Sequence, residues 1–239
     1  MQYSFNIVDL QARAFGLTTI EDFKKLATGE LTPDVNAKNP KPVNIPMMAS
    51  RRLSGGCRMA VDIGIELCKT HEVDAVIYSS STGELEHNYK VLLAAAQKQD
   101  PSPTDFTMSV HNTGVGNFTI LGKKKIPSSS ICAGTDSLLM AFVDAVAMLK
   151  NGLKKVLVVD YNVEISDFFK NYLPKDFPSY PNAVAFVIED GDGVTVTSKV
   201  KTTDHICMTQ SLDFVLNYLK GTKEFTLDGT KLSYDIKVK

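Results

Sequence analysis

The segment from Thr135 to Lys150 leaves almost no polar side to a helix formed there. A helix that is apolar all round cannot face water cheaply and must lie inside a domain. The residues before it, Ile126 to Ile131, favour a short strand, and Asn151-Gly152 favours a left-handed helix stop. The pattern therefore predicts a strand, a tight turn that carries Cys132, and a buried helix. The apolar residues of this helix are Leu138, Leu139, Met140, Ala141, Phe142, Val143, Ala145, Val146, Ala147, Met148 and Leu149.

Cys132 occupies the turn directly before this predicted helix. The amino end of a helix carries a partial positive charge and free amide donors, which stabilise a thiolate relative to a thiol. Cys132 is therefore a candidate nucleophile. The alternative is that Cys132 packs as a small hydrophobic side chain, which is the commoner role of a free cysteine.

The composition excludes several classes of protein. A formal net charge of -1 argues against nucleic acid or an anionic membrane as a partner. No apolar run is long enough to span a bilayer, and the first residues lack the basic region and apolar core of a secretory signal. We therefore expect a cytoplasmic protein with no nucleic-acid partner and no membrane partner.

The cysteines and histidines are too widely scattered to indicate a metal site or a disulfide framework. No Cys-x-x-Cys pair is present, and the histidines show no ligand-like spacing. We expect free thiols, no metal and no cofactor. The residues concerned are Cys57, Cys68, Cys132, Cys207, His71, His87, His111 and His205.

The rest of the chain alternates between strand and helix patterns. Buried strands are predicted where short apolar runs have polar flanks, and helices where apolar residues recur every three or four positions. Asp190-Gly191-Asp192 between two apolar runs predicts an antiparallel hairpin. We therefore expect a single α/β domain over residues 1–239 with a mixed sheet. The predicted strands are 3–10, 74–79, 126–131, 155–161, 183–189, 193–198 and 232–238, and the other helices are 20–27, 54–69, 82–99, 113–122 and 211–220.

Three other features compete with Cys132 as functional signals. Gly114-Val115-Gly116 lacks the third glycine of a dinucleotide fingerprint, and no strand leads directly into it. His111 lies at the expected start of a buried helix, where it is either functional or, more commonly, structural. Glu84 and Glu86 are most simply explained as solvated helix residues.

Several segments in succession resemble the amino-terminal half of a β-ketoacyl-acyl-carrier-protein synthase. The likeness is strongest to the short β-ketoacyl-synthase-like proteins of aryl polyene and flexirubin pigment pathways. It covers roughly residues 40 to 190, and the combination is far more specific than any one motif. The segments that carry it are Arg51-Arg52-Leu53-Ser54, Asp74-Ala75-Val76-Ile77-Tyr78-Ser79, Gly83-Glu84-Leu85, Ser109-Val110-His111-Asn112, Gly122, Pro127, Ile131-Cys132-Ala133-Gly134-Thr135-Asp136-Ser137, Ala141 and Val156-Leu157-Val158-Val159-Asp160.

The resemblance implies a thiolase-like half fold, with a five-stranded mixed β-sheet and a buried central helix. Cys132 matches the acyl-accepting cysteine of the family, which many short relatives similar to chain-length factors have lost. Full condensing enzymes add a second half that supplies catalytic histidines, one of them in an HGTGT-like stretch. No such stretch follows Cys132, and His205 lies in a different sequence setting. Losing one donor to a developing oxyanion typically costs a hundredfold or more in rate, so independent condensation is not expected.

The leading hypothesis is therefore an accessory, chain-length-factor-like subunit that pairs with a full ketosynthase acting on acyl carrier protein thioesters. In this resemblance-based picture residues 107–118 lie at the dimer interface. His111 is a second candidate catalytic residue, in addition to Cys132. The residues expected to line or close a substrate tunnel at that interface are Met108, His111, Asn112, Val115 and Phe118.

Two other hypotheses remain open. In the first, the chain is an acyl-transferring or condensing enzyme that uses Cys132 as a nucleophile on acyl carrier protein thioesters. In the second, it is a half-thiolase domain that forms a homodimer and binds a hydrophobic ligand. Acylation of Cys132 separates the first from the rest, and an apolar tunnel in a homodimer with an unreactive Cys132 favours the second.

Overall fold

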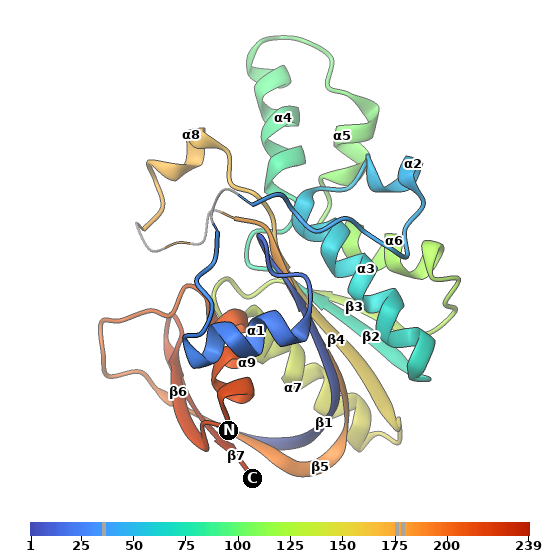
Figure 1. Cartoon of the computed structure of the whole chain (residues 1–239). Helices are drawn as coiled ribbons and strands as arrows, with labels where there is room; N and C mark the ends of the chain where they lie inside the picture. Colours follow the sequence, from blue (N-terminus) through green and yellow to red (C-terminus); the bar gives the residue numbers. More distant parts are fainter. Residues whose placement is uncertain (35–36, 175–176, 178–179) are drawn as a thin grey trace.

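A computed structural model of the chain describes residues 1–34, 37–174, 177 and 180–239. Strands and helices alternate through most of it, as the sequence pattern predicts (Figure 1). The strands are β1 (Gln2–Arg13), β2 (Ala75–Ser79), β3 (Ser128–Ile131), β4 (Lys155–Asn162), β5 (Asn182–Val200), β6 (Glu224–Asp228) and β7 (Leu232–Val238). The helices are α1 (Ile20–Thr28), α2 (Met47–Ser50), α3 (Gly55–Thr70), α4 (Leu85–Ala96), α5 (Pro103–Met108), α6 (Thr113–Leu121), α7 (Ser137–Lys150), α8 (Asp167–Lys170) and α9 (Gln210–Lys220).

The strands form one mixed sheet in the order β3-β2-β4-β5-β7-β6, and β1 also pairs with β5. β2 pairs in parallel with both β3 and β4, whereas every other pairing is antiparallel. Strands β3, β2, β4, β5 and β1 correspond to the five-stranded mixed sheet that was expected. That strand number is nevertheless wrong for this chain, whose sheet has 7 strands in the described residues, because β7 and β6 continue it along the second half of β5.

Both faces of the sheet are covered, so each strand contributes to two cores. Side chains alternate between the faces of a strand. In β4, Val156 and Val158 pack on the side of α7, while Leu157, Val159 and Tyr161 pack on the side of α3. This explains why β2 and β4 read as continuous apolar runs instead of alternating ones.

The prediction of a hairpin over residues 183–198 is wrong, because β5 continues through these residues as a single bent strand. β1 pairs with both halves of β5, with a register shift between Phe5 and Asn6. The Asn6 side chain fills the bend, where its Oδ1 accepts a hydrogen bond of 2.9 Å from the Gly193 amide. A Cβ on Gly191 would lie 2.3 Å from the Asn6 side chain. Glycine at this position therefore leaves room for Asn6 at a β-bulge and does not form a hairpin turn.

Helix α7 is confirmed over most of its predicted length, but it is not enclosed on every side. Phe142 is fully buried and contacts Phe5, Phe186 and Phe214 at ring-centroid distances of 4.6, 5.3 and 5.4 Å. Ala147 on the opposite side is exposed. The sheet and α9 cover one side of α7, and the described residues provide no second layer over the other.

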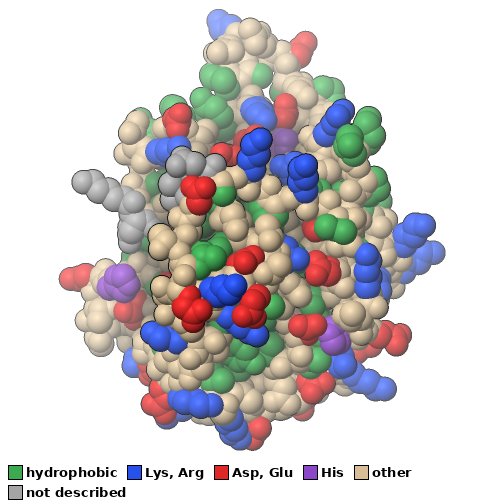
Figure 2. Space-filling view, in the orientation of Figure 1, with side chains coloured by type: hydrophobic (Ala, Val, Ile, Leu, Met, Phe, Trp, Pro, Cys, Tyr) green, Lys and Arg blue, Asp and Glu red, His purple; other side chains and the backbone are tan. Residues whose placement is uncertain are grey.

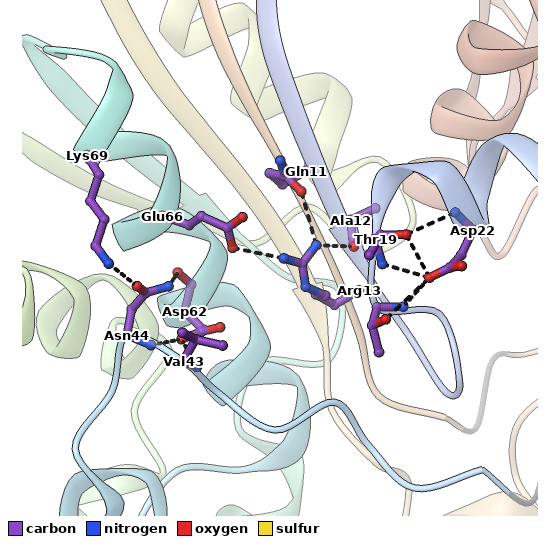
Figure 3. Close-up of polar contacts among 11 residues, drawn as sticks. Gln11, Ala12, Arg13, Thr19, Asp22, Val43, Asn44, Asp62, Glu66 and Lys69 are labelled. Atoms are coloured by element: carbon purple, nitrogen blue, oxygen red, sulfur yellow. Dashed lines mark hydrogen bonds and ion pairs between the residues drawn. The ribbon is translucent and has the colours of Figure 1, made fainter.

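The segment formed by residues 37–46, which we call the α3 strap, crosses the surface of α3. The buried Asp62 of α3 accepts hydrogen bonds from the amides of Val43 and Asn44 at 2.9 and 2.6 Å, and Lys69 bonds the Asn44 side chain (Figure 3). These bonds fix the chain that leads into α2. None of the helices in the described part of the chain is long and apolar enough to cross a membrane.

Candidate functional site at the carboxyl ends of β2, β3 and β4

Cys132 follows the last residue of β3 and precedes a tight turn into α7. The turn is closed by Ser137, whose Oγ accepts a bond of 3.0 Å from the Ala133 amide and donates one of 2.7 Å to the Gly134 carbonyl. Gly134 has a φ of +59°, a conformation that favours glycine. Cys132 itself is exposed, and no hydrogen bond from a described residue reaches its thiol. The alternative of Cys132 as a buried hydrophobic side chain does not hold in the isolated chain.

The turn formed by residues 132–137, which we call the cysteine turn, is bound by the carboxyl-terminal part of the chain. Asp136 does not cap α7 with its side chain, but accepts a hydrogen bond of 3.1 Å from Gln210 at the start of α9. Thr135 bonds Thr230 in the β6–β7 connection at 3.2 Å. A Cβ on Gly229 would lie 1.8 Å from the Asp136 carboxylate, so any other residue at position 229 would displace the Asp136 side chain. The turn is therefore fixed by residues that lie far away in the sequence.

A buried carboxyl group lies at the ends of the parallel strands β2 and β4. Asp160 is 4% exposed, and its Oδ1 accepts a hydrogen bond of 2.7 Å from Ser79, its cross-strand neighbour. Burial raises the pKa of Asp160 to about 7, against the opposing effect of hydrogen bonds from Ser79 and Ser211. Near neutral pH this carboxyl can therefore hold or release a proton.

His111 is held in place by two neighbours. Its Nδ1 lies 2.8 Å from the Ser130 hydroxyl, and its Nε2 lies 3.3 Å from the Ser80 carbonyl oxygen. Because a carbonyl can only accept, Nε2 carries a proton. A Cβ on Gly83 would lie 3.1 Å from the imidazole, and Gly83 also has a φ of +55°. The histidine thus joins the β2 and β3 ends, but no hydrogen bond links it to Cys132 within the described residues.

The expectation that Glu84 is a solvated helix residue is wrong, since Glu84 is 2% exposed. Its Oε1 accepts a hydrogen bond of 3.0 Å from the Tyr161 hydroxyl. Burial raises the pKa of the Glu84 carboxyl, and hydrogen bonds oppose that effect. No signal near Glu84 in the sequence reveals this burial, because Tyr161 comes from a distant strand.

The other predicted site residues lie along α5 and α6. Asn112 is exposed at the start of α6, and Met108 is half-buried at the end of α5. Val115 is 6% exposed, and Phe118 is fully buried with its ring 5.7 Å from that of Tyr78. Phe118 therefore contributes to the core beneath α6, and the role of all four residues in a tunnel remains a prediction.

Apolar side chains gather at the surface near the free edge of the sheet. β3 ends the strand order and, among the described strands, pairs only with β2. Phe106 and Val110, in and after α5, are 63% and 48% exposed, and Ile120 on α6 is 73% exposed. Further hydrophobic side chains reach the surface over α2 and beside α4 (Figure 2). No group of acidic, histidine or cysteine side chains among the described residues could hold a metal ion.

Comparisons with known proteins support the resemblance seen in the sequence. A chain in a complex of a ketosynthase, ApeO, with its chain length factor, ApeC, from Xenorhabdus doucetiae is 38% identical to this one, with a TM-score of 0.92. The match covers 98% of this chain and 99% of that chain, so the two are of nearly equal length. No curated protein sequence matches significantly.

More distant structures show the fold alone. The ishigamide ketosynthase/chain length factor is 15% identical with a TM-score of 0.66, covering 84% of this chain and 69% of that chain. A β-ketoacyl synthase from Burkholderia phymatum STM815 is 12% identical with a TM-score of 0.59, covering 92% and 71%. The family described as the amino-terminal domain of β-ketoacyl synthases matches residues 27–235. The chain therefore belongs to the β-ketoacyl synthase amino-terminal domain family, with a thiolase-like mixed α/β fold.

Proposed function

We propose that this protein is an accessory, chain-length-factor-like subunit. It pairs with a full-length β-ketoacyl-acyl-carrier-protein synthase during polyketide-type chain elongation of the aryl polyene kind, on substrates carried by acyl carrier protein. The observation that carries the proposal is the free edge of β3 beside the exposed Phe106, Val110 and Ile120. The nearly full-length match to a chain from a ketosynthase and chain length factor complex supports the same assignment.

β3 leaves one edge of the described sheet unpaired. A strand at the edge of a sheet presents free amides and carbonyls that another strand can bind, and monomeric proteins usually protect such edges. Exposed apolar residues beside such an edge favour burial against a partner. β3 combines the two features, so we place the ketosynthase partner, or a second copy of this chain, against β3, α5 and α6.

The chemistry of the site supports an accessory role. Cys132 has no hydrogen bond to a histidine within the described residues, and His111 is bound to Ser130 and Ser80. Residues 1–239 contain no stretch that resembles the histidine motif of the second half of condensing enzymes. Without donors for the enolate oxygen, decarboxylative condensation would lose a hundredfold or more in rate. All four cysteines are free thiols, which is typical of the cytoplasm, where we place the protein.

Pairing can be tested by co-expression with the full-length ketosynthase of the same organism and size-exclusion chromatography with light scattering. We expect one heterodimer peak, and we expect Ile120→Asp to weaken the complex at least tenfold. Val200→Asp is a matched control, because Val200 is 77% exposed but lies at the end of β5. Two separate peaks for the wild type, or equal effects of both variants, would contradict the proposal.

A second function is supported by the exposure of Cys132 in the turn that leads into α7. In it, the thiol accepts an acyl group from an acyl carrier protein thioester, with the carrier thiol as leaving group. Incubation with acyl carrier protein thioester followed by intact-mass analysis tests this. Acylation of the wild type that is lost in Cys132→Ser would support an acyl-transferring enzyme. If the wild-type chain stays unmodified, this second function is ruled out and only the accessory-subunit function is left.

A further inference from the structure

A separate cavity lies between the end of β1, helix α1 and helix α9, and it has no part in the site described above. Its volume is about 420 Å³, and neither the cysteine turn nor α6 contributes to its walls. Hydrophobic side chains are visible at the surface above α1 in this part of the molecule (Figure 2). Cavities of 300–1,000 Å³ with mostly apolar walls are typical of small-molecule sites.

The apolar walls come from elements that are held firmly. The rings of Phe15 and Tyr180 lie with their centroids 6.1 Å apart, and Leu26 of α1 and Leu216 of α9 both line the cavity. Helix α1 begins with a capping box, in which Thr19 and Asp22 bond each other's backbone amides (Figure 3). The remaining apolar lining residues are Ala14, Leu17, Phe23, Pro33 and Leu212.

One charged side chain, Asp213 of α9, lies in this wall together with Thr32 and Thr209. Its Oδ2 accepts hydrogen bonds of 2.8 Å from both the Cys207 thiol and the Thr209 hydroxyl. Burial and, as the second largest cause, the hydrogen bond to Asp213 raise the pKa of Cys207 to about 12. The thiol therefore stays protonated and donates its hydrogen bond to Asp213. No hydrogen bond from the described residues reaches Oδ1 of Asp213. The carboxylate is therefore oriented through one oxygen, and the other can accept a bond from a ligand.

We propose that this cavity binds a small amphiphile, with an apolar aromatic or alkyl body between α1 and α9 and a hydrogen-bond-donating hydroxyl or amine at Asp213. A carboxylate ligand cannot donate a hydrogen bond to Asp213, and its negative charge is repelled by the Asp213 carboxylate. Acids with the same apolar body therefore bind more weakly. A protonated amine binds more tightly than an alcohol, because hydrogen bonds between charged partners are about twice as strong as neutral ones. The site thus selects by head group among ligands of equal size.

Isothermal titration calorimetry of the full chain with three matched probes tests the proposal: 4-phenylbutylamine, 4-phenylbutan-1-ol and 4-phenylbutyrate. We expect the amine to bind most tightly, the alcohol next, and the acid at least tenfold more weakly than the amine. Asp213→Asn should weaken the amine at least fivefold and change the alcohol little. Equal binding of the amine and the acid, or no binding of any probe, would overturn the proposal.

A second set of variants shows whether the probes occupy this cavity. Leu216→Trp fills it from α9 and should abolish binding of all three probes. Leu26→Trp fills it from α1 and serves if the first variant does not keep the circular dichroism spectrum of the wild type. Leu92→Trp on α4 is the matched control, since Leu92 is 58% exposed and does not line the cavity. Unchanged binding in a folded cavity-filling variant would overturn the assignment.

Discussion

Asp160→Asn is expected to make the protein more stable at neutral pH, although it removes a buried hydrogen-bonding carboxyl. Asp160 is 4% exposed and has no basic side chain as a salt-bridge partner among the described residues. Burial raises its pKa from 3.8 to about 7. The folded chain therefore holds a proton that the unfolded chain releases above pH 4. The free energy of unfolding falls as pH rises from about 4 to about 7.

The size of the effect follows from the difference in pKa. Each pKa unit corresponds to about 1.4 kcal/mol, so a difference of about 3 gives an upper limit of about 4 kcal/mol. Asparagine resembles the protonated carboxyl in shape and carries no charge, and its carbonyl can still accept the Ser79 hydroxyl bond. At pH 4.5, where the unfolded carboxyl is already mostly ionised, we expect the variant to be more stable by no more than about 1 kcal/mol. At pH 7.5 the variant should be more stable by about 1–4 kcal/mol, because water penetration and relaxation reduce the full charge penalty.

Urea unfolding followed by circular dichroism at intervals from pH 4.5 to 8 measures this difference. Glu84, the other carboxyl whose pKa burial raises, is present in both proteins and cancels in the comparison. Asp204→Asn, at an exposed carboxyl, is the control for loss of one negative charge. A variant that is less stable than the wild type at pH 7.5, or a difference that does not change with pH, would contradict the raised pKa of Asp160 in the folded chain.

Three further changes test the packing, each by urea unfolding or proteolysis. Phe142→Ala removes a fully buried ring and should cost about 3–5 kcal/mol of unfolding free energy, so a loss under 1 kcal/mol would contradict the described core. Gly56→Ala places a Cβ 2.0 Å from a backbone oxygen of β4 and should destabilise by about 2 kcal/mol or more, whereas Gly116→Ala, with no atom within 4 Å, should not. Asp62→Ala frees two strap amides, so trypsin should cut the α3 strap faster; an unchanged rate would mean that other contacts hold it.

Features that depend on local pattern could be predicted from the sequence. The apolar run of α7, the turn at Cys132 and the buried strands β2 and β4 each follow from neighbouring residues, and the structure contains all of them. The turn at Cys132 also has the expected glycine, since Gly134 adopts a positive φ. Local periodicity therefore located the elements around the candidate site.

Features that depend on distant contacts could not be predicted in this way. Glu84 is buried because Tyr161, from another strand, donates to it, and β5 continues through a turn-like sequence because Asn6 fills its bend. The clamp of Asp136 by Gln210 is likewise invisible until the fold brings α9 to the cysteine turn. The roles of Cys132, His111 and the α5–α6 residues stay predictions, because they depend on a partner.

Amide hydrogen exchange of β3 tests whether this edge of the sheet binds the ketosynthase partner. In the chain alone, the backbone of the edge strand Ser128–Ile131 pairs with β2 and with no other described strand, so amides on its free side should exchange rapidly. Addition of the full-length ketosynthase of the same organism should slow exchange in peptides that cover β3 and α6 at least tenfold, while β6 at the far end of the sheet stays unchanged. Protection of β6 alone, or no protection of β3 at saturating ketosynthase, would contradict the proposed pairing.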